Sequence, residues 1–409
     1  MTKKISLAIF LLFFYVFVGK SAYLLIPMDN SQTNHLKAYG IAYLSLQKKL
    51  DIRWLLNYRG GSFLIPFQKT IQEECTIRGV SSEVIADVQA SNILREISRP
   101  EVNMDATKLE KAPRIAVYSP KNKLPWDDAV TLALTYAEIP YDVIYDGEIL
   151  DGKLIDYDWL HLHHEDFTGQ YGKFYKSYHL MPWYEEQVRE NEGMATKYGF
   201  NKVSMLKLAV SKLIKSYVAN GGFLFAMCSG TDSFDIALSA ENTDICESMY
   251  DGDPADPEVQ NKLDFSRTFA FKDFEIKRDP FEYEYSTIDA TTTRRVAISD
   301  DFFSLFEFSA KWDPVPTMLC QNHKNLIKGF MGQTTSFNKE YIKSNVLIMG
   351  ENKLLKEAKY IHGEYNKGTW TYYAGHDPED YHHRVGDPPT NLDNYPDSPG
   401  YRLILNNIL

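Results

Sequence analysis

From Arg114 onward, short apolar segments alternate with stretches that carry apolar residues at helical spacing. The apolar segments read RIAVYSP, YDVIYD, YDWLHLHH and FLFAMC, and the stretches between them include WDDAVTLALTYAEI and MLKLAVSKLIKSYVANGG. Strands that alternate with helices favour a parallel sheet with helices on both faces. The pattern therefore predicts an α/β fold for the main part of the chain.

The rest of the chain suggests one further unit and two insertions. AYLLIPM, NHLKAYGIAYLSLQKKL, IRWLLNY and VIADVQASNILREIS predict an N-terminal α/β unit over 22–107. RPEVNMDATKLEKAP resembles a linker to a core over 108–409. We expect a polar and aromatic insertion at about 167–193 and a β-rich insertion at about 251–365. GTWTYYAGH then returns to the main sheet, and SPGYRLILNNIL predicts a closing helix.

Alternation of apolar residues predicts several strands inside the second insertion. The segments expected to be strands are FEYEYSTID, RRVAIS, FSLFEFSA, VPTMLCQN, NVLIMGE and AKYIHGEY.

The first residues predict a secretory signal peptide over 1–21. Lys3 and Lys4 precede an apolar run that ends at Val18, and Gly19 and Ser21 suit a cleavage site. The run is shorter than the roughly 20 residues that cross a bilayer. We therefore expect an exported protein, periplasmic or secreted, with no stable membrane insertion after cleavage of the signal.

Composition limits the partners of the chain. The formal net charge is -11, and an acidic surface repels phosphate backbones, so no nucleic acid is expected. The four cysteines lack close pairing, which disfavours an all-cysteine zinc site. The remaining expectation is a small-molecule substrate or ligand, with no cofactor and with the oligomeric state left open.

Reactive side chains stand at the ends of three predicted strands. YDWLHLHH ends in His161, His163 and His164, FLFAM is followed by Cys228, and GTWTYYAG is followed by His376. Ligands of open parallel sheets bind outside the carboxyl ends of the strands, so we expect these residues to converge. Ala226 and Gly230 would let a sharp turn present Cys228 as a nucleophile. His376 would be its base, oriented by Asp377 or Glu379. The alternative is a buried thiol without chemistry.

Two segments together resemble the trehalose-utilisation (ThuA-like) proteins of the class I glutamine amidotransferase-like superfamily. They are GGFLFAMCSGTDSF, with Thr231 and Asp232, and GTWTYYAGHDPED, with the run from Gly375 to Glu379. The resemblance implies a flavodoxin-like parallel sheet from about Arg114 to Leu409. ThuA-like proteins commonly carry His at the Cys228 position, whereas amidotransferases use Cys there as nucleophile. Amidotransferases end in His-Pro-Glu, so the added Asp377 leaves the third member of the triad open.

The leading hypothesis is an exported hydrolase or amidase that acts on a small metabolite or sugar derivative. Its catalytic residues would be Cys228, His376 and Glu379. A second hypothesis is a non-catalytic ThuA-like module that binds a carbohydrate or metabolite. The side chains expected to bind the substrate are His163, His164, Glu165, Gly230, Thr231, Asp232 and Asp377.

A third function follows from another resemblance. SGTDS resembles the SGGxDS pyrophosphatase loop of asparagine synthetases. This resemblance implies an enzyme of the asparagine synthetase B type. The loop is one Gly short, and backbone N–H groups of those glycines wrap a pyrophosphate. The N-terminal Cys of that family is absent, because Met1 is followed by Thr2. The mechanism is therefore disfavoured.

HLHHED also raises the question of a metal. His161 and His163 would share one face of a strand, and Glu165 or Asp166 could complete a zinc site with them. His376, His382 and His383 could add ligands. Because the helical spacing HExxH is absent, we predict no metal site here.

Overall fold

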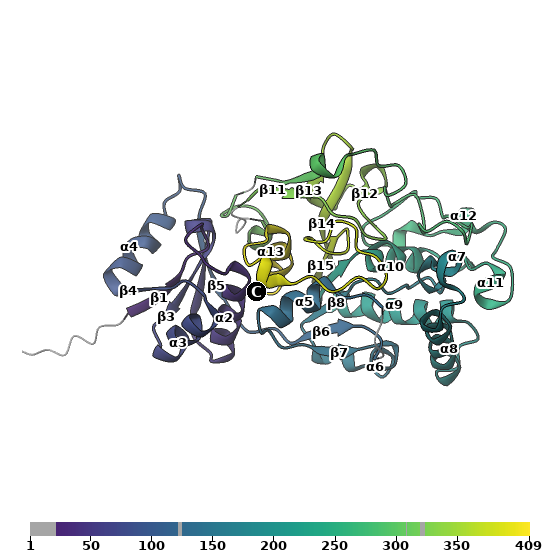
Figure 1. The fold of residues 1–409 in the computed structure, drawn as a ribbon, viewed down its shortest axis with the longest axis horizontal. Coiled ribbons are helices and arrows are strands. Elements are labelled where there is room, and N and C mark those ends of the chain that lie inside the picture. The colour runs from purple at the N-terminus through teal and green to yellow at the C-terminus, as the bar shows by residue number, and fades with distance from the viewer. Residues whose placement is uncertain (1–21, 122–124, 308, 320–323) are drawn as a thin grey trace, which may run out of the picture.

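The fold is mixed α/β and is built on two sheets (Figure 1). It comes from a computed structural model that describes residues 22–121, 125–307, 309–319 and 324–409. The predicted signal peptide at 1–21 lies outside the described residues. The α/β class predicted from the sequence is confirmed at this level, but the larger sheet is mixed, not purely parallel.

The first sheet is entirely antiparallel and follows the order β4-β1-β3-β2-β5. Its strands are β1 (Ala22–Ile26), β2 (Ile52–Leu56), β3 (Ser62–Pro66), β4 (Glu83–Ala86) and β5 (Asp105–Leu109). Its helices are α2 (His35–Gln47), α3 (Lys69–Arg78) and α4 (Asp87–Ile97). The predicted linker thus contains β5, which crosses position 107 because its backbone pairs with the outer edge of β2.

The second sheet combines five parallel strands with an antiparallel extension. Its order is β11-β10-β13-β14-β15-β9-β8-β6-β7, and β12 pairs with β14. The parallel strands are β6 (Ile115–Tyr118), β7 (Asp142–Ile144), β8 (Trp159–Leu162), β9 (Phe223–Met227) and β15 (Gly368–Tyr373). The others are β10 (Phe302–Leu305), β11 (Leu326–Lys328), β12 (Phe337–Asn338), β13 (Leu347–Asn352) and β14 (Glu357–Tyr365).

Helices cover both faces of the parallel strands, because residues of each strand alternate between two apolar clusters. In β9, Phe225 and Met227 join the cluster that contains α5 and α13, whereas Leu224 and Ala226 join the cluster of α9 and α10. These helices are α5 (Ala129–Tyr136), α13 (Pro399–Asn406), α9 (Val203–Ala219) and α10 (Ser229–Ser239). The other helices of this part of the chain are α6 (Asp146–Leu150), α7 (Tyr175–Tyr178), α8 (Pro182–Lys197), α11 (Ser248–Asp251) and α12 (Val259–Lys262).

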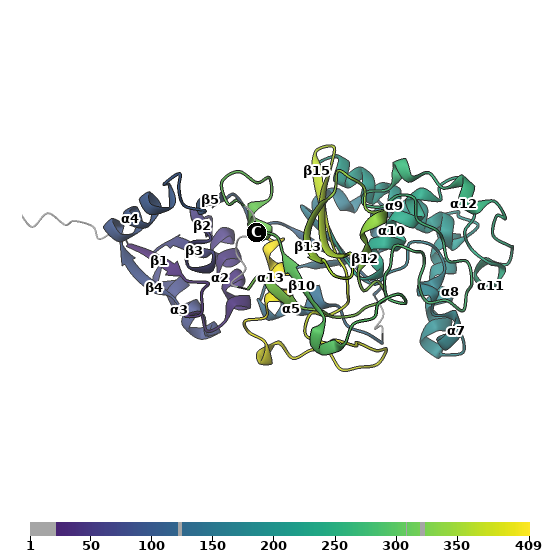
Figure 2. The same ribbon diagram turned by 90° about the horizontal axis from the view of Figure 1, so that it is seen from above.

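Helix α13 connects the two sheets. In both views it lies between α2 and the strands of the second sheet (Figure 1, Figure 2). Arg402 of α13 is fully buried and donates from Nε to the hydroxyl of Tyr39 at 3.0 Å. Its other nitrogens donate to the carbonyls of Met28 and Gly60. The C-terminal helix therefore holds the N-terminal unit through a buried guanidinium.

The second predicted insertion differs from expectation. The first, at 167–193, contains α7 and most of α8. FEYEYSTID and RRVAIS are loops with isolated bridges and a short 3₁₀ turn, and VPTMLCQN contains a 3₁₀ turn over Pro316–Met318. Their aromatic and apolar residues pack from loops into the core, as Tyr285 and Ile288 do at 1% and 0% exposure. These segments alternate apolar and polar residues because some of their side chains are buried, although their described backbone forms no ladder with a strand.

Candidate active site

The carboxyl ends of four parallel strands bring the predicted site residues together. Asp127 and Asp128 follow β6, His163 and His164 follow β8, Cys228 follows β9, and His376 follows β15. The ring centroids of His163 and His376 lie 4.6 Å apart, and those of His163 and His164 lie 5.0 Å apart. Neighbouring parallel strands end at one edge of the sheet, so residues more than 200 positions apart meet there.

Cys228 sits on a strained turn between β9 and α10. Its φ is 48° and its ψ is -138°, a backbone conformation that costs a non-glycine residue about 1–3 kcal/mol. The turn is held from both sides. The Gly230 N–H donates to the His163 carbonyl at 2.5 Å, and the Thr231 hydroxyl donates to the Cys228 carbonyl at 2.6 Å. A Cβ at Gly230 would lie 2.5 Å from that His163 oxygen, which explains the glycine.

A segment from the second insertion closes over the sulfur. The backbone N–H of Gln333 donates to Cys228 Sγ at 3.3 Å, and Cys228 is only 2% exposed. The Gln333 side-chain amide donates to the Gly172 carbonyl at 2.5 Å, which fixes the segment in place. Nothing in the sequence around Gln333 marks it as a site residue, so sequence reasoning missed it.

His376 contacts both a thiol and a carboxylate. Burial and the nearby His163 lower its pKa, but attraction to Asp127 and Cys228 outweighs them, and the pKa lies above its ordinary value. Asp127 Oδ1 lies 3.5 Å from His376 Nε2. Burial raises the pKa of Asp127, yet His376 and His383 bring it below its usual range.

The predicted orienting carboxylates lie elsewhere. The Asp377 carboxylate accepts from the Tyr401 hydroxyl at 2.7 Å and from the Glu379 N–H at 2.8 Å. Burial raises the pKa of Glu379, and its carboxylate interacts with Ser398. Among the described residues, the carboxylate within ion-pair distance of His376 is that of Asp127. The sequence-based prediction did not include Asp127 among the site residues.

Two aspartates each connect a pair of histidines. Asp128 caps α5 and lies 3.1 Å from His161 Nε2 and 3.2 Å from His163 Nδ1. Asp127 lies 3.0 Å from His383 Nε2 as well as near His376. Burial raises the pKa of Asp128, but His161 and His163 hold it well below its usual range.

Four groupings in this region bring metal-ligating atoms within reach of one another. They are Asp127 with His376 and His383, His163 with His164 and His376, Asp128 with His161 and His163, and Asp380 with His383 and Asp387. His383 lies outside the residues predicted to bind the substrate or to catalyse. The only signal for it in the sequence was its place in the histidine-rich segment after His376.

The remaining predicted residues are buried behind the site. Asp232 Oδ1 accepts from the Thr334 hydroxyl at 2.8 Å, and burial raises the pKa of Asp232 to about 7. Burial and the nearby Asp128 raise the pKa of Glu165 to about 8. Both residues support the turn and the strand ends from within the core.

A cavity of about 210 Å³ opens onto Cys228. Aromatic, histidine and insertion residues line it: Trp126, His164, Phe174, Cys228, Tyr283, Thr291, Met331, Gly332, Gln333, His376, His382, His383, Arg384 and Val385. His163 is fully buried and lies behind His376 and not on the cavity wall. The cavity is therefore the place where a small ligand would meet the thiol.

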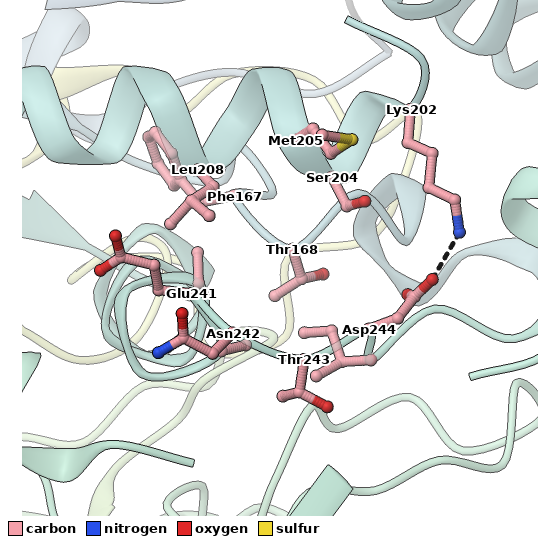
Figure 3. Close-up of a pocket in the computed structure, with 13 residues that line it drawn as sticks. Phe167, Thr168, Lys202, Ser204, Met205, Leu208, Glu241, Asn242, Thr243 and Asp244 are labelled. Atoms are coloured by element: carbon pink, nitrogen blue, oxygen red, sulfur yellow. Dashed lines mark hydrogen bonds and ion pairs between the residues drawn. The ribbon is translucent and has the colours of Figure 1, made fainter. Parts of the chain in front are cut away.

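A second cavity of about 330 Å³ lies between α9 and the chain that follows α10 (Figure 3). Leu208 and Phe167 form its apolar side, and Lys202 stands at one end. The Lys202 ammonium pairs with Asp244 at 2.5 Å and with Asp251 at 3.1 Å. Glu241 in the lining pairs with Lys212 and Arg267, so the charged side chains that line this cavity already have ion-pair partners.

Comparisons with known proteins leave the family open. No family model and no curated protein matches this chain. Two solved structures align with most of it: Cytoplasmic Protein STM1381 from Salmonella typhimurium LT2 and Cytoplasmic Protein STM3548 from Salmonella typhimurium. The first has 12% identity and a TM-score of 0.37, and covers 72% of this chain and 99% of its own. The second has 10% identity and a TM-score of 0.32, and covers 71% and 97%.

A third similar structure is Gan42B, a GH42 beta-galactosidase. It has 12% identity and a TM-score of 0.29, and covers 65% of this chain and 28% of its own. At these scores the likenesses carry no argument about activity.

The expectation of an exported protein is contradicted by these comparisons. The two structures that align with most of the chain are both titled cytoplasmic proteins, and the predicted signal at 1–21 lies outside the described residues. Export is therefore not carried further. No helix in the described ranges is long and apolar enough to cross a membrane.

Proposed function

We propose that this chain is a cysteine-dependent hydrolase or amidase of the class I glutamine amidotransferase-like type. Cys228 is its nucleophile, His376 is its base, and Asp127 orients His376. The observation that carries the proposal is the backbone of Cys228, with φ 48° and ψ -138° at a strand-to-helix turn beside a cavity. Such a turn exposes a nucleophile at the end of a sheet strand.

The order of the parallel strands supports a flavodoxin-like core. Numbered along the chain, β6, β7, β8, β9 and β15 are the first to fifth parallel strands, and their spatial order is β7-β6-β8-β9-β15. This is the order 2-1-3-4-5 of flavodoxin-like sheets, in which ligands bind at the point where the order reverses. Asp127 follows β6 and His163 follows β8, the two strands beside that point.

The proposed reaction has two steps. Cys228 Sγ attacks a carbonyl carbon of the substrate while His376 accepts the thiol proton. His376 then returns this proton to the leaving amine or alcohol, and a thioester remains on Cys228. A water molecule, deprotonated by His376, attacks the thioester carbon and releases the acid and the thiol. The N–H groups of Gln333 and of Ser229, the residue after Cys228, are the donors suited to the carbonyl oxygen.

The cavity favours a small substrate. Its volume of about 210 Å³ is below that of ordinary drug-sized pockets. Trp126, Phe174 and Tyr283 supply flat apolar walls, and such walls suit a small metabolite or a sugar derivative.

Thiol alkylation tests the proposal without a known substrate. Burial raises the pKa of Cys75 to about 11 and that of Cys246 well above its ordinary value, so both thiols stay protonated at pH 7.5. We expect iodoacetamide to modify Cys228 at least about tenfold faster than either of them. Peptide mass spectrometry with a Cys320→Ser background would give the rates. Equal alkylation rates at Cys228 and Cys75 in the folded protein would contradict the proposal.

A pair of variants separates activation from simple access. His376→Ala should slow alkylation of Cys228 because the thiol loses its proton acceptor. His179→Ala, at an exposed position on the surface, should leave the rate unchanged. If both variants react like the wild type, His376 is not the base.

A further inference from the structure

Three polar atoms converge beside the cavity at Cys228. Asp127 Oδ1 lies 3.0 Å from His383 Nε2 and 3.5 Å from His376 Nε2. The three side chains are 13%, 5% and 9% exposed, in the order Asp127, His383, His376. The three atoms are therefore almost sealed from bulk water but adjoin a cavity that a small solute can enter.

These atoms lie close together without bonding one another. In the described part of the chain, both oxygens of Asp127 and Nε2 of both histidines are buried and make no hydrogen bond of ordinary geometry. Buried polar atoms are nearly always hydrogen-bonded, so four such atoms in one place require an explanation. Short distances with unsuitable angles are expected when the atoms are directed at a common point between them.

A neighbouring carboxylate prepares one of the histidines for this role. Asp380 Oδ2 lies 3.0 Å from Nδ1 of His383. A neutral imidazole that donates from Nδ1 presents a lone pair on Nε2, the atom that faces Asp127. A carboxylate that accepts from the far nitrogen of a histidine commonly orients that histidine toward a metal.

We propose that Asp127, His376 and His383 bind a divalent transition metal of the Zn²⁺ type, with Asp380 as a positioning residue for His383. Imidazole and carboxylate ligands bind zinc at about 2.0–2.2 Å. Ligands at that radius in a tetrahedral site stand roughly 3.4 Å from one another, close to the observed 3.0 and 3.5 Å. His376 and His383 line the cavity, so a fourth position would face it.

This inference goes beyond the proposed function, because metal binding by these residues does not require Cys228 to react. The two are linked at one residue. His376 serves the thiol in the metal-free protein, and a metal on its Nε2 would hold the ring as a ligand. Metal loading should therefore slow alkylation of Cys228.

The test uses Co²⁺ as a coloured probe. The full chain is stripped with EDTA, dialysed and titrated with Co²⁺, and the visible absorption and the bound metal are measured. We expect one Co²⁺ per chain, displaced by one equivalent of Zn²⁺. His383→Ala should weaken binding at least about 100-fold, and Asp380→Asn should weaken it about 10- to 100-fold.

His179→Ala is the matched control, because His179 is exposed and belongs neither to the cavity lining nor to the cluster. Its affinity should stay within about twofold of the wild type, and circular dichroism should show that every variant is folded. The inference is overturned if the folded wild type binds no stoichiometric Co²⁺, or if His179→Ala weakens binding as much as His383→Ala. Alkylation of Cys228 in the stripped protein is scored separately, so a failed metal site and a failed nucleophile give different results.

Discussion

The backbone N–H of Gln333 donates to the sulfur of Cys228 over 3.3 Å, although 105 residues separate the two. The donor belongs to the insertion between α10 and β15, and the acceptor belongs to the core sheet. The insertion therefore completes the site: it supplies a hydrogen-bond donor and one wall of the cavity.

Gly332→Ala should restrict access to Cys228 from this side of the cavity. A Cβ at Gly332 would lie 3.0 Å from Cys228 Sγ and 2.7 Å from the backbone nitrogen of His376, so the segment must move or the thiol must be covered. We expect alkylation of Cys228 to fall at least about tenfold, while most of the stability remains, since the change touches one loop. Rates from mass spectrometry and the melting temperature check this.

The matched glycine for that experiment is Gly193 in α8, where an added Cβ meets nothing within 4 Å. Gly193→Ala should keep the wild-type alkylation rate and should slightly raise the stability, because Ala is the better helix former. Unchanged alkylation in Gly332→Ala would show that the insertion does not control access to Cys228.

The buried Lys359 should make stability depend on pH. Burial and the nearby Arg294 lower its pKa to about 7, against the attraction of Asp301, Glu357 and Cys228. The unfolded chain therefore holds more protons than the folded chain between about pH 7 and pH 10, and the free energy of unfolding rises with pH there. The loss of folding stability caused by burying Lys359 is full below pH 7, and it becomes smaller as the pH approaches the ordinary pKa of lysine.

Lys359→Met should remove this dependence. A pKa difference of one unit corresponds to about 1.4 kcal/mol, so from pH 7 to pH 9.5 the wild type should gain about 2–3 kcal/mol relative to the variant. The variant also loses donors to the carbonyls of Phe330 and Thr335, which lowers its stability at every pH. Urea unfolding at the two pH values gives the difference, and parallel curves would contradict the assignment to Lys359.

Arg402→Met should loosen the N-terminal unit. The change leaves the buried carbonyls of Met28 and Gly60 without their charged donor, and such losses cost about 1–3 kcal/mol each. We expect a loss of roughly 3 kcal/mol in the free energy of unfolding, with earlier loss of hydrogen-exchange protection in β1 to β5 than in β8 and β9. Arg53→Met, at an exposed position of β2, should change little.

ATP should not bind at SGTDS. The residues from Ser229 to Ser233 form the first turn of α10 and are buried, so no open loop is present to wrap a pyrophosphate. Isothermal titration calorimetry with Mg-ATP should show no heat of binding. A protein concentration on the order of 0.1 mM is enough to detect a ligand that binds with micromolar affinity. Binding that Asp232→Asn or Ser233→Ala abolishes would restore the synthetase hypothesis.

Sequence patterns anticipated the parallel strands well, because hydrophobic periodicity is a local property of each segment. The structure contains the strand that precedes Cys228, the helix over Val203–Ala219 and the return of the chain to the sheet at Trp370. The same local reasoning failed for FEYEYSTID, since an aromatic residue can be buried from a loop as well as from a strand.

The sequence by itself determined which reactive side chains follow which strands, and parallel order then requires them to share an edge. Only the tertiary structure decided which carboxylate stands beside His376. Asp377 and Glu379 are nearer along the chain, but their side chains turn toward Tyr401 and Ser398. Asp127 reaches His376 because β6 and β15 end at one edge of the same sheet. Side-chain direction depends on packing between distant segments, and no local pattern encodes it.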